Sequence, residues 1–174
     1  MDSLLIVLAA LAPETFFDLS YPVGARTKWQ VSGEVHMQMT RKRGESKEGF
    51  LWVVQLENNN FEVLLSKDRS EMISAMQIHA NGEKVAIPGA SMWYSPLHRA
   101  STEQRSKSIL SSDVMTKTAL GSFSCKKAVL IDDEGNIFRW TLSDDVIGGV
   151  VEYEVVFAGT PKRRIVYMLV EQEK

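Results

Sequence analysis

The chain has 174 residues, of which 44% are hydrophobic and 24% charged, and its formal net charge is -2. This length suits one domain, and the composition is that of an ordinary soluble globular protein, which excludes disordered, collagen-like and coiled-coil classes. The near balance of charge gives no overall attraction to nucleic acid, and the single cysteine, Cys125, excludes an intrachain disulfide and a cysteine-based metal cluster.

The amino terminus carries an apolar run, Leu4 to Ala12, that is too short to span a bilayer. The run is similar to the hydrophobic region of a secretory signal and ends in a small-x-small sequence, but Asp2 replaces the expected basic residue and Pro13 follows directly. The alternative is a short retained helix. We therefore expect residues 1–28 to be a helix or a signal-like segment and residues 29–174 to form the domain.

Period-two alternation begins at Trp29 and predicts strands. The alternation from Trp29 to Thr40 predicts one long amphipathic strand, and the basic, glycine-containing stretch from Arg41 to Gly49 predicts an exposed hairpin connection. Phe50 to Leu56 is apolar on both sides except for Gln55, which predicts a central strand covered on both faces.

A second group of strands follows, separated by turn residues. A return strand is expected from Phe61 to Leu65, another from Met72 to His79, and a tight turn at Asn81-Gly82, a pair that favours the φ > 0 conformation. Val85 and Ile87 continue the sheet. The polar stretch from Leu97 to Ser108 predicts a surface loop.

The last third of the chain is predicted to contain one short helix and four strands. The helix begins at a capping Ser111 or Ser112 and ends near Gly121. The strands are Lys126 to Ile131, Ile137 to Leu142, Val150 to Phe157 and Arg163 to Val170. The whole pattern predicts a mostly β (α+β) single domain with eight or nine antiparallel strands and one or two short helices.

The motifs that carry enzyme chemistry are incomplete in this sequence. Gly121-Ser122-Phe123-Ser124-Cys125 is similar to a nucleophile elbow, but Cys125 stands where that motif needs glycine. Cys125 as an activated thiol is the alternative to a small buried residue. The histidines have no metal-ligand spacing, and the acidic pairs sit in predicted turns, so we expect neither a metal nor a cofactor.

Large apolar side chains are distributed over the alternating strands. Methionine adapts to irregular shapes, and a long curved sheet with few helices has more concave apolar surface than those helices fill. We therefore expect a cavity that binds an apolar ligand. Its predicted lining residues are Met37, Met39, Trp52, Phe61, Met72, Met76, Met92, Trp93 and Tyr94.

The order of these motifs resembles the LolA/LolB-type superfamily of bacterial lipoprotein carriers, and more closely its outer-membrane lipoprotein-sorting branch. The matching segments cover about residues 29 to 170 and include Gly33-Glu34-Val35-His36-Met37, Phe50 to Leu56, Asn81-Gly82, Met92-Trp93-Tyr94-Ser95-Pro96, Leu97-His98-Arg99, Ser112-Asp113 and Gly159 to Ile165. The sequence departs from the pattern at Ser111, where the family has glycine.

The resemblance implies a curved antiparallel half-barrel, open along one side, with a few short helices covering its concave face. It implies a non-enzymatic carrier for lipoprotein acyl chains or other lipids, located in the periplasm, which takes its cargo from an inner-membrane transporter and passes it to an outer-membrane acceptor. No nucleic acid partner is implied.

Two other interpretations stay open at this point. The violacein-pathway protein VioE resembles this fold and acts without metal or cofactor, so a cofactor-independent enzyme for a hydrophobic small molecule is one alternative. Such an enzyme would need convergent polar groups, for which Tyr94, Ser95, His98 and Arg99 are candidates. The other is an envelope scaffold with a filled core.

Overall fold

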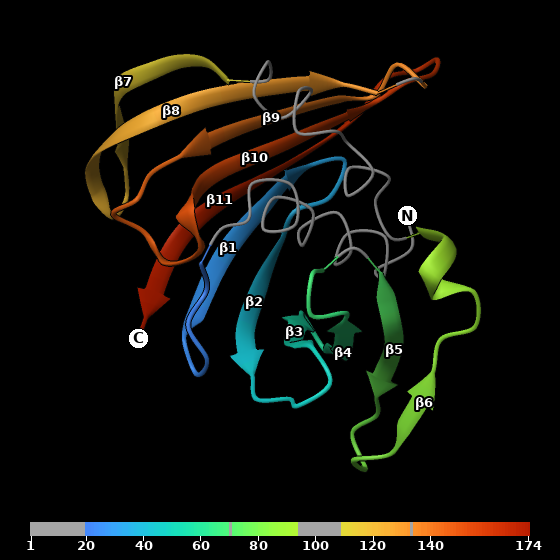
Figure 1. Cartoon of the computed structure of the whole chain (residues 1–174). Coiled ribbons are helices and arrows are strands. Elements are labelled where there is room, and N and C mark those ends of the chain that lie inside the picture. The colour runs from blue at the N-terminus through green and yellow to red at the C-terminus, as the bar shows by residue number, and fades with distance from the viewer. Residues whose placement is uncertain (1–19, 70, 94–108, 133) are drawn as a thin grey trace.

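The computed structural model describes residues 20–69, 71–93, 109–132 and 134–174 (Figure 1). These residues form one 11-stranded antiparallel sheet in the order β6-β5-β4-β3-β2-β1-β11-β10-β9-β8-β7. The strands are β1 (Arg26–Gly33), β2 (Met37–Gly44), β3 (Phe50–Leu56), β4 (Asn59–Leu65), β5 (Met72–Ile78), β6 (Lys84–Ala86), β7 (Ile109–Thr118), β8 (Gly121–Ile131), β9 (Ile137–Leu142), β10 (Val150–Phe157) and β11 (Arg163–Glu173). The helices among these residues are two short 3₁₀ turns, η1 (Ala90–Trp93) and η3 (Ile147–Gly149).

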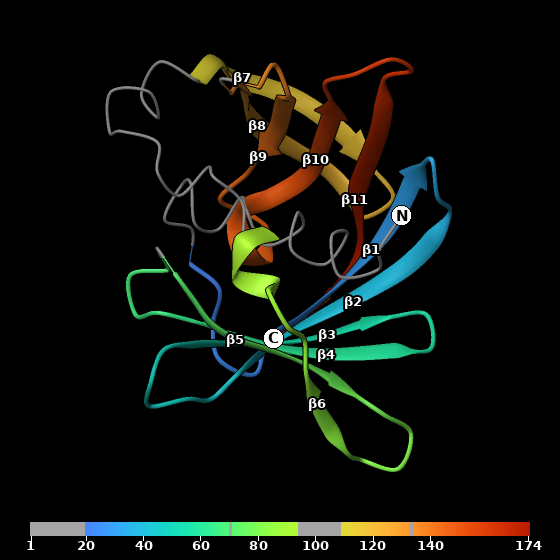
Figure 2. The same ribbon diagram turned by 90° about the vertical axis from the view of Figure 1, so that its right-hand side faces the viewer.

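The sheet is open, and it is strongly bent. The strand order places β6 and β7 at its two edges. Figure 2 shows that the sheet folds over near β1 and β11, so that the half containing β2–β6 and the half containing β7–β10 face one another. The predicted mostly β, curved and open antiparallel architecture is confirmed. The predicted amino-terminal helix lies outside the described residues, and the helical cover of the concave face stays a prediction.

One face of the sheet is apolar, and it is the inner face of the bend. Directly paired residues of antiparallel strands share a face, and one such row runs Tyr167, Val31 and Met37 across β11, β1 and β2. Buried side chains from both halves, Trp52 and Trp140 among them, belong to one hydrophobic cluster. That common cluster identifies the buried face as the inner one.

The sheet has 11 strands where the sequence predicts eight or nine, and several predicted boundaries are wrong. The predicted long strand from Trp29 to Thr40 is two strands, because β1 ends at Gly33 and β2 begins at Met37. The predicted exposed connection beginning at Arg41 is strand until Gly44, since Arg41 and Arg43 pair with β3 and are buried. The predicted helix after Ser111 is strand β7, which pairs with β8.

Several other strands lie where the alternation predicts them. β3, β9 and β10 have the predicted bounds, and Gly82 has a φ of +83° in the turn between β5 and β6. β3 differs in its environment, because Trp52, Val54 and Leu56 on its inner face are buried, whereas Leu51 and Val53 on the other face are half-buried and Gln55 is exposed. The face of β3 away from the core is therefore only partly covered.

An ion-pair group lies on the outer face of the carboxy-terminal half. Arg139 Nη1 donates to Glu154 Oε2 at 2.7 Å, and Arg164 Nε donates to the other oxygen, Oε1. Burial by itself raises the pKa of Glu154, but the hydrogen bonds and charges of the two arginines outweigh it and hold the pKa below its ordinary value of 4.5. The carboxylate therefore ties β9, β10 and β11 together.

A depressed pKa makes the contribution of Glu154 depend on pH. Its stabilisation is fully present above the unfolded value of about 4.5 and is lost as the pH falls through the folded value. Glu154→Gln is expected to lower the free energy of unfolding by about 1–2 kcal/mol near neutral pH, with the difference from the wild type shrinking in acid.

Urea unfolding at about pH 7 and about pH 3 measures this difference. Glu173→Gln is the control, because Glu173 pairs with Arg26 at 3.8 Å with both side chains largely exposed, and its change should stay within about 0.5 kcal/mol. A Glu154→Gln difference of the same size at both pH values would contradict the assignment.

Candidate functional site

The inner face of the sheet is the candidate site, and its carboxy-terminal half carries a ladder of stacked rings. Phe138 and Trp140 on β9 have ring centroids 6.2 Å apart, and Trp140 stacks on Tyr153 of β10 at 5.6 Å. Tyr153 stacks on Tyr167 of β11, also at 5.6 Å. Burial raises the pKa of the Tyr167 phenol, with the charge of Arg41 acting in the opposite direction, so the phenol stays neutral.

The amino-terminal half of the inner face holds most of the predicted lining residues. Met39, Trp52 and Phe61 are at most 3% exposed, and Met72 is 9% exposed. Met37 is half-buried and packs against the same cluster. The side chains of Met39, Trp52 and Phe61 thus contact other atoms of the chain in this structure, and a guest must displace some of those contacts to reach them.

Among the other predicted lining residues, the structure places the side chain of Met76, which lies away from this group. Met76 pairs with Glu62, one position along from the inner-face pair of Ala75 and Val63, so Met76 lies on the outer face. Met92 and Trp93 belong to η1, whose backbone alone is described for these two residues, and Tyr94 lies outside the described residues. Their part in a cavity stays a prediction.

A cluster of arginine and aromatic side chains at the inner face was missed by the sequence analysis. We call it the arginine–aromatic cluster, and its members are Tyr21, Trp29, Arg41, Arg43, Phe50, Trp52 and Arg69. The alternation of Met37 and Met39 continues in phase to Arg41 and Arg43, and that phase is the signal that would have placed both arginines on the buried face.

Arg41 lies at the centre of the cluster, enclosed by rings. Its Cζ atom is 4.8 Å from the ring centroid of Trp29, 5.4 Å from that of Trp52 and 5.6 Å from that of Tyr21. Guanidinium groups at such distances are attracted by the negative faces of the rings. These contacts stabilise the charged guanidinium of Arg41 inside an otherwise apolar core.

A short hydrogen-bond chain fixes the rings around Arg41. Trp29 Nε1 donates to Thr27 Oγ1 at 2.9 Å, and that hydroxyl is 2.6 Å from the Tyr21 hydroxyl. Tyr21 in turn donates to the backbone carbonyl of Arg41 at 3.2 Å. The residues just before β1 are therefore part of the inner-face packing.

Arg43 is the second inner-face arginine of β2, one pleat along from Arg41. Its Cζ atom lies 3.8 Å from the ring centroid of Phe50 and 6.0 Å from that of Trp52. Arg69, in the turn between β4 and β5, brings its Cζ atom to 4.8 Å from the same Phe50 ring. Two guanidinium groups thus meet at one phenyl ring.

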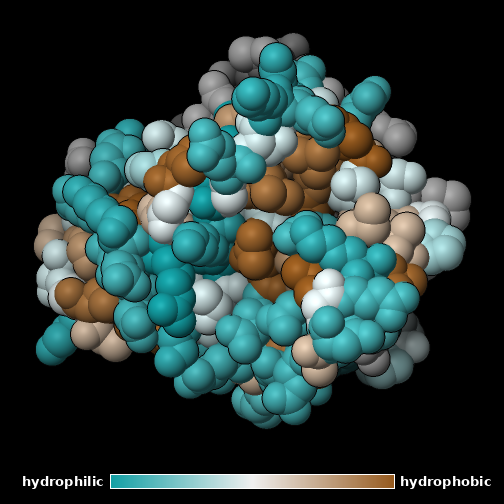
Figure 3. Space-filling view, turned by 90° about the horizontal axis from the view of Figure 1, so that it is seen from below, coloured by the Kyte–Doolittle hydropathy of each residue, from teal (hydrophilic) through white to brown (hydrophobic). Residues whose placement is uncertain are grey.

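The molecular surface also has an apolar area, on the side that is the underside in the view of Figure 1. Hydrophobic residues gather in the middle of this side around a hollow, and hydrophilic residues border them on both sides (Figure 3). Large hydrophobic side chains that are at least 40% exposed include Ile73, Val85 and Met168.

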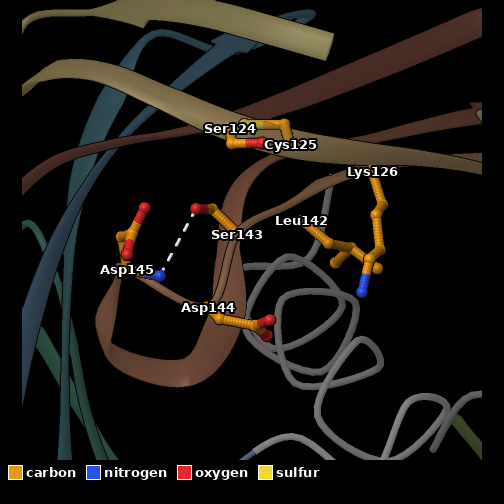
Figure 4. Close-up of a pocket in the computed structure, with 7 residues that line it drawn as sticks. All are labelled: Ser124, Cys125, Lys126, Leu142, Ser143, Asp144 and Asp145. Carbon is orange, nitrogen blue, oxygen red and sulfur yellow. Dashed lines mark hydrogen bonds between the residues drawn. The ribbon is translucent and has the colours of Figure 1, made fainter. Parts of the chain in front are cut away.

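A separate pocket of 260 Å³ lies beside β8 and the turn after β9 (Figure 4). It is lined by Ser124, Cys125, Lys126, Leu142, Ser143, Asp144 and Asp145. The Cys125 thiol is buried and donates to the carbonyl of Phe123 at 3.5 Å, so the thiol is directed to the backbone of its own strand. None of the seven lining residues is a histidine that could activate it.

The described residues give no sign of a metal centre or of a membrane-spanning helix. They contain no group of three or more histidine, cysteine, aspartate or glutamate side chains placed to hold a metal ion. They also contain no helix of the length and apolar character needed to cross a membrane. His36 and His79 are exposed, and His98 lies outside the described residues.

Comparison with solved structures gives distant similarities. No family model matches the chain, and no curated protein matches it. The crystal structure of the lipoprotein LppX from Mycobacterium tuberculosis is similar over 97% of this chain and 96% of that chain, with 10% sequence identity and a TM-score of 0.41. At this identity and TM-score the similarity decides neither fold nor ligand, which rest on this chain's own residues.

Proposed function

We propose that this protein is a non-enzymatic binding or carrier protein for the acyl chains of lipids or lipoproteins. The observation that carries the proposal is the largely apolar inner face, which extends across both halves of a bent, open sheet. The acyl chain lies against this face, between the two halves. Transfer of an acyl chain requires apolar contact and release, and no bond is made or broken.

Apolar burial supplies the binding free energy in this proposal. Each buried methylene contributes about 0.8 kcal/mol, so a chain of more than ten methylenes offsets the cost of association. Met37, Met39 and Met72 contribute unbranched, adaptable side chains to the amino-terminal half of the face. A face of this kind accepts chains of different length.

Entry of the chain requires a change of shape. The inner-face side chains are closely packed, so the two halves separate or the covering atoms move when a ligand enters. The two halves are joined through the pairing of β1 with β11, and the opposite edges, β6 and β7, end the sheet. Motion at this junction moves the two halves apart, while the strand pairings inside each half stay intact.

The proposed setting is the periplasm, with a transporter of the inner membrane as donor and a protein of the outer membrane as acceptor. These partners follow from the motif resemblance in the sequence.

Quenching of tryptophan fluorescence tests whether an acyl chain reaches the inner face. A brominated stearate that enters is expected to quench at least half of the tryptophan emission, because Trp29, Trp52 and Trp140 all belong to the inner-face cluster. Unbrominated stearate is the control, because it shows how much binding changes the tryptophan emission when no bromine is present to quench it. Emission that is unchanged by saturating brominated stearate would contradict the proposal.

A further inference from the structure

The arginine–aromatic cluster contains hydrogen-bond donors that have no acceptor. Arg43 Nε and Nη1 and Trp52 Nε1 are fully covered and have no hydrogen-bond partner among the residues that the structure describes. No ion pair joins Arg43 to a carboxylate among the described residues. A guanidinium and an indole N–H are hydrogen-bond donors only, so Arg43 and Trp52 cannot hydrogen-bond to each other.

Burial makes this arrangement costly for the unliganded protein. The Arg43 side chain is about nine-tenths buried, and desolvation lowers the pKa of its guanidinium without removing the charge at neutral pH. Arg69 brings a second positive charge to the same Phe50 ring. A buried cation needs a negative acceptor, and stacking on Phe50 alone supplies none.

The two donor residues lie in one row with apolar side chains of the neighbouring strands. Arg43 and Trp52 are directly paired on β2 and β3, and the same row continues to Val63 on β4 and Ala75 on β5. Neighbouring strands are about 4.8 Å apart, so this row extends roughly 14 Å from Arg43 on β2 to Ala75 on β5. The row has hydrogen-bond donors at one end and apolar side chains at the other, which is the pattern of groups that an amphiphile with an anionic head presents.

We propose that Arg43 and Trp52 bind the anionic headgroup, a carboxylate or phosphate, of the lipid whose acyl chain lies on the inner face. This inference rests on the proposed function and names its ligand class as anionic amphiphiles. The headgroup oxygens accept from Arg43 Nε and Nη1 and from Trp52 Nε1. Because these atoms are covered, the headgroup reaches them during the same opening that admits the chain.

The test compares ligands with the same chain and different heads, each displacing the brominated stearate. Oleate and oleoyl lysophosphatidate are expected to bind the wild type roughly 10- to 100-fold more tightly than oleyl alcohol, the range for charge-assisted hydrogen bonds. Arg43→Met is expected to reduce this preference to less than about threefold while leaving the affinity for oleyl alcohol within about threefold of the wild-type value.

Arg163→Met is the matched control. Arg163 also lies over a phenylalanine ring, with its Cζ atom 5.6 Å from the centroid of Phe157, but it is exposed and belongs to the β10–β11 hairpin. Its preference for the anionic ligands should equal that of the wild type. Trp52→Phe, which keeps a ring and removes one donor, is the second variant if Arg43→Met does not fold, and it should weaken the preference in the same direction.

The outcomes separate this inference from the function on which it rests. A wild type that binds neither oleate nor oleyl alcohol contradicts the proposed function. A wild type that binds both equally, or an Arg43→Met variant that keeps the full preference, overturns the headgroup site and leaves the function standing. Displacement by inorganic phosphate alone, without any preference among the oleyl ligands, also overturns it.

Discussion

Replacing Trp140 with alanine is expected to lower the free energy of unfolding by about 3–5 kcal/mol. Trp140 is 1% exposed and stands between Phe138 and Tyr153 in the stacked ladder. Its loss removes the largest ring of the ladder and leaves a cavity between β9 and β10, because the neighbouring rings are held by their own strands. A loss of this size is a large part of the total stability of a domain.

Chemical denaturation of the wild type, Trp140→Ala and Trp140→Phe measures this effect. The phenylalanine variant keeps a stacked ring and should lose about half as much or less, since the residual cavity is smaller. The ladder would not be the centre of this half of the core if Trp140→Ala cost less than about 1 kcal/mol.

Replacing Gly33 with alanine is expected to cost about 2–5 kcal/mol, from backbone strain and a steric clash together. Gly33 ends β1 with a φ of +110°, and a Cβ atom there would lie 2.2 Å from the carbonyl oxygen of Arg164. That oxygen already accepts a hydrogen bond from the Glu34 amide at 3.1 Å, so it cannot move freely. The clash falls at the pairing of β1 with β11, which joins the two halves of the sheet.

Gly121→Ala separates the two causes. Gly121 has a φ of +132°, but no atom lies within 4 Å of the position of its added Cβ, so this variant carries the strain without the clash. Thermal unfolding should show a clearly larger loss for Gly33→Ala than for Gly121→Ala. Equal losses would mean that the close approach of β1 to β11 has no energetic consequence.

The strands that the sequence predicts correctly are those in which alternation ends at a turn signal. Ile137 to Leu142 and Val150 to Phe157 are bounded by turns containing glycine, and both strands have the predicted bounds. The expected open, curved antiparallel sheet is also confirmed. Membership of the lipoprotein-carrier family stays a prediction.

The errors have a common physical origin in the two-residue period. Val31 pairs with Met37 across the β1–β2 hairpin, so apolar residues on both strands keep the same parity and the turn leaves no break in the pattern. Period alone therefore cannot distinguish one long strand from two. At Ser111 the local residues suit a helix cap, but pairing with β8 along Val114 to Thr118 decides for a strand.

The sequence predicts only part of the candidate site, because some of its residues are charged. Inner-face positions such as Met39 and Trp52 follow from their apolar character, whereas Arg41 and Arg43 are charged and read as an exposed loop. Their burial depends on Tyr21, Trp29 and Phe50, which come from distant positions in the chain. Only the folded sheet brings these rings to the arginines.

Native mass spectrometry of the purified protein, before and after incubation with oleate, tests the central claim most directly. We expect a mass increase equal to one or a few oleate molecules, or to acyl lipids already retained, which organic extraction then releases and identifies. A protein that carries no acyl lipid on purification and takes up no oleate would show that the inner face is a filled core, and the carrier function would be wrong.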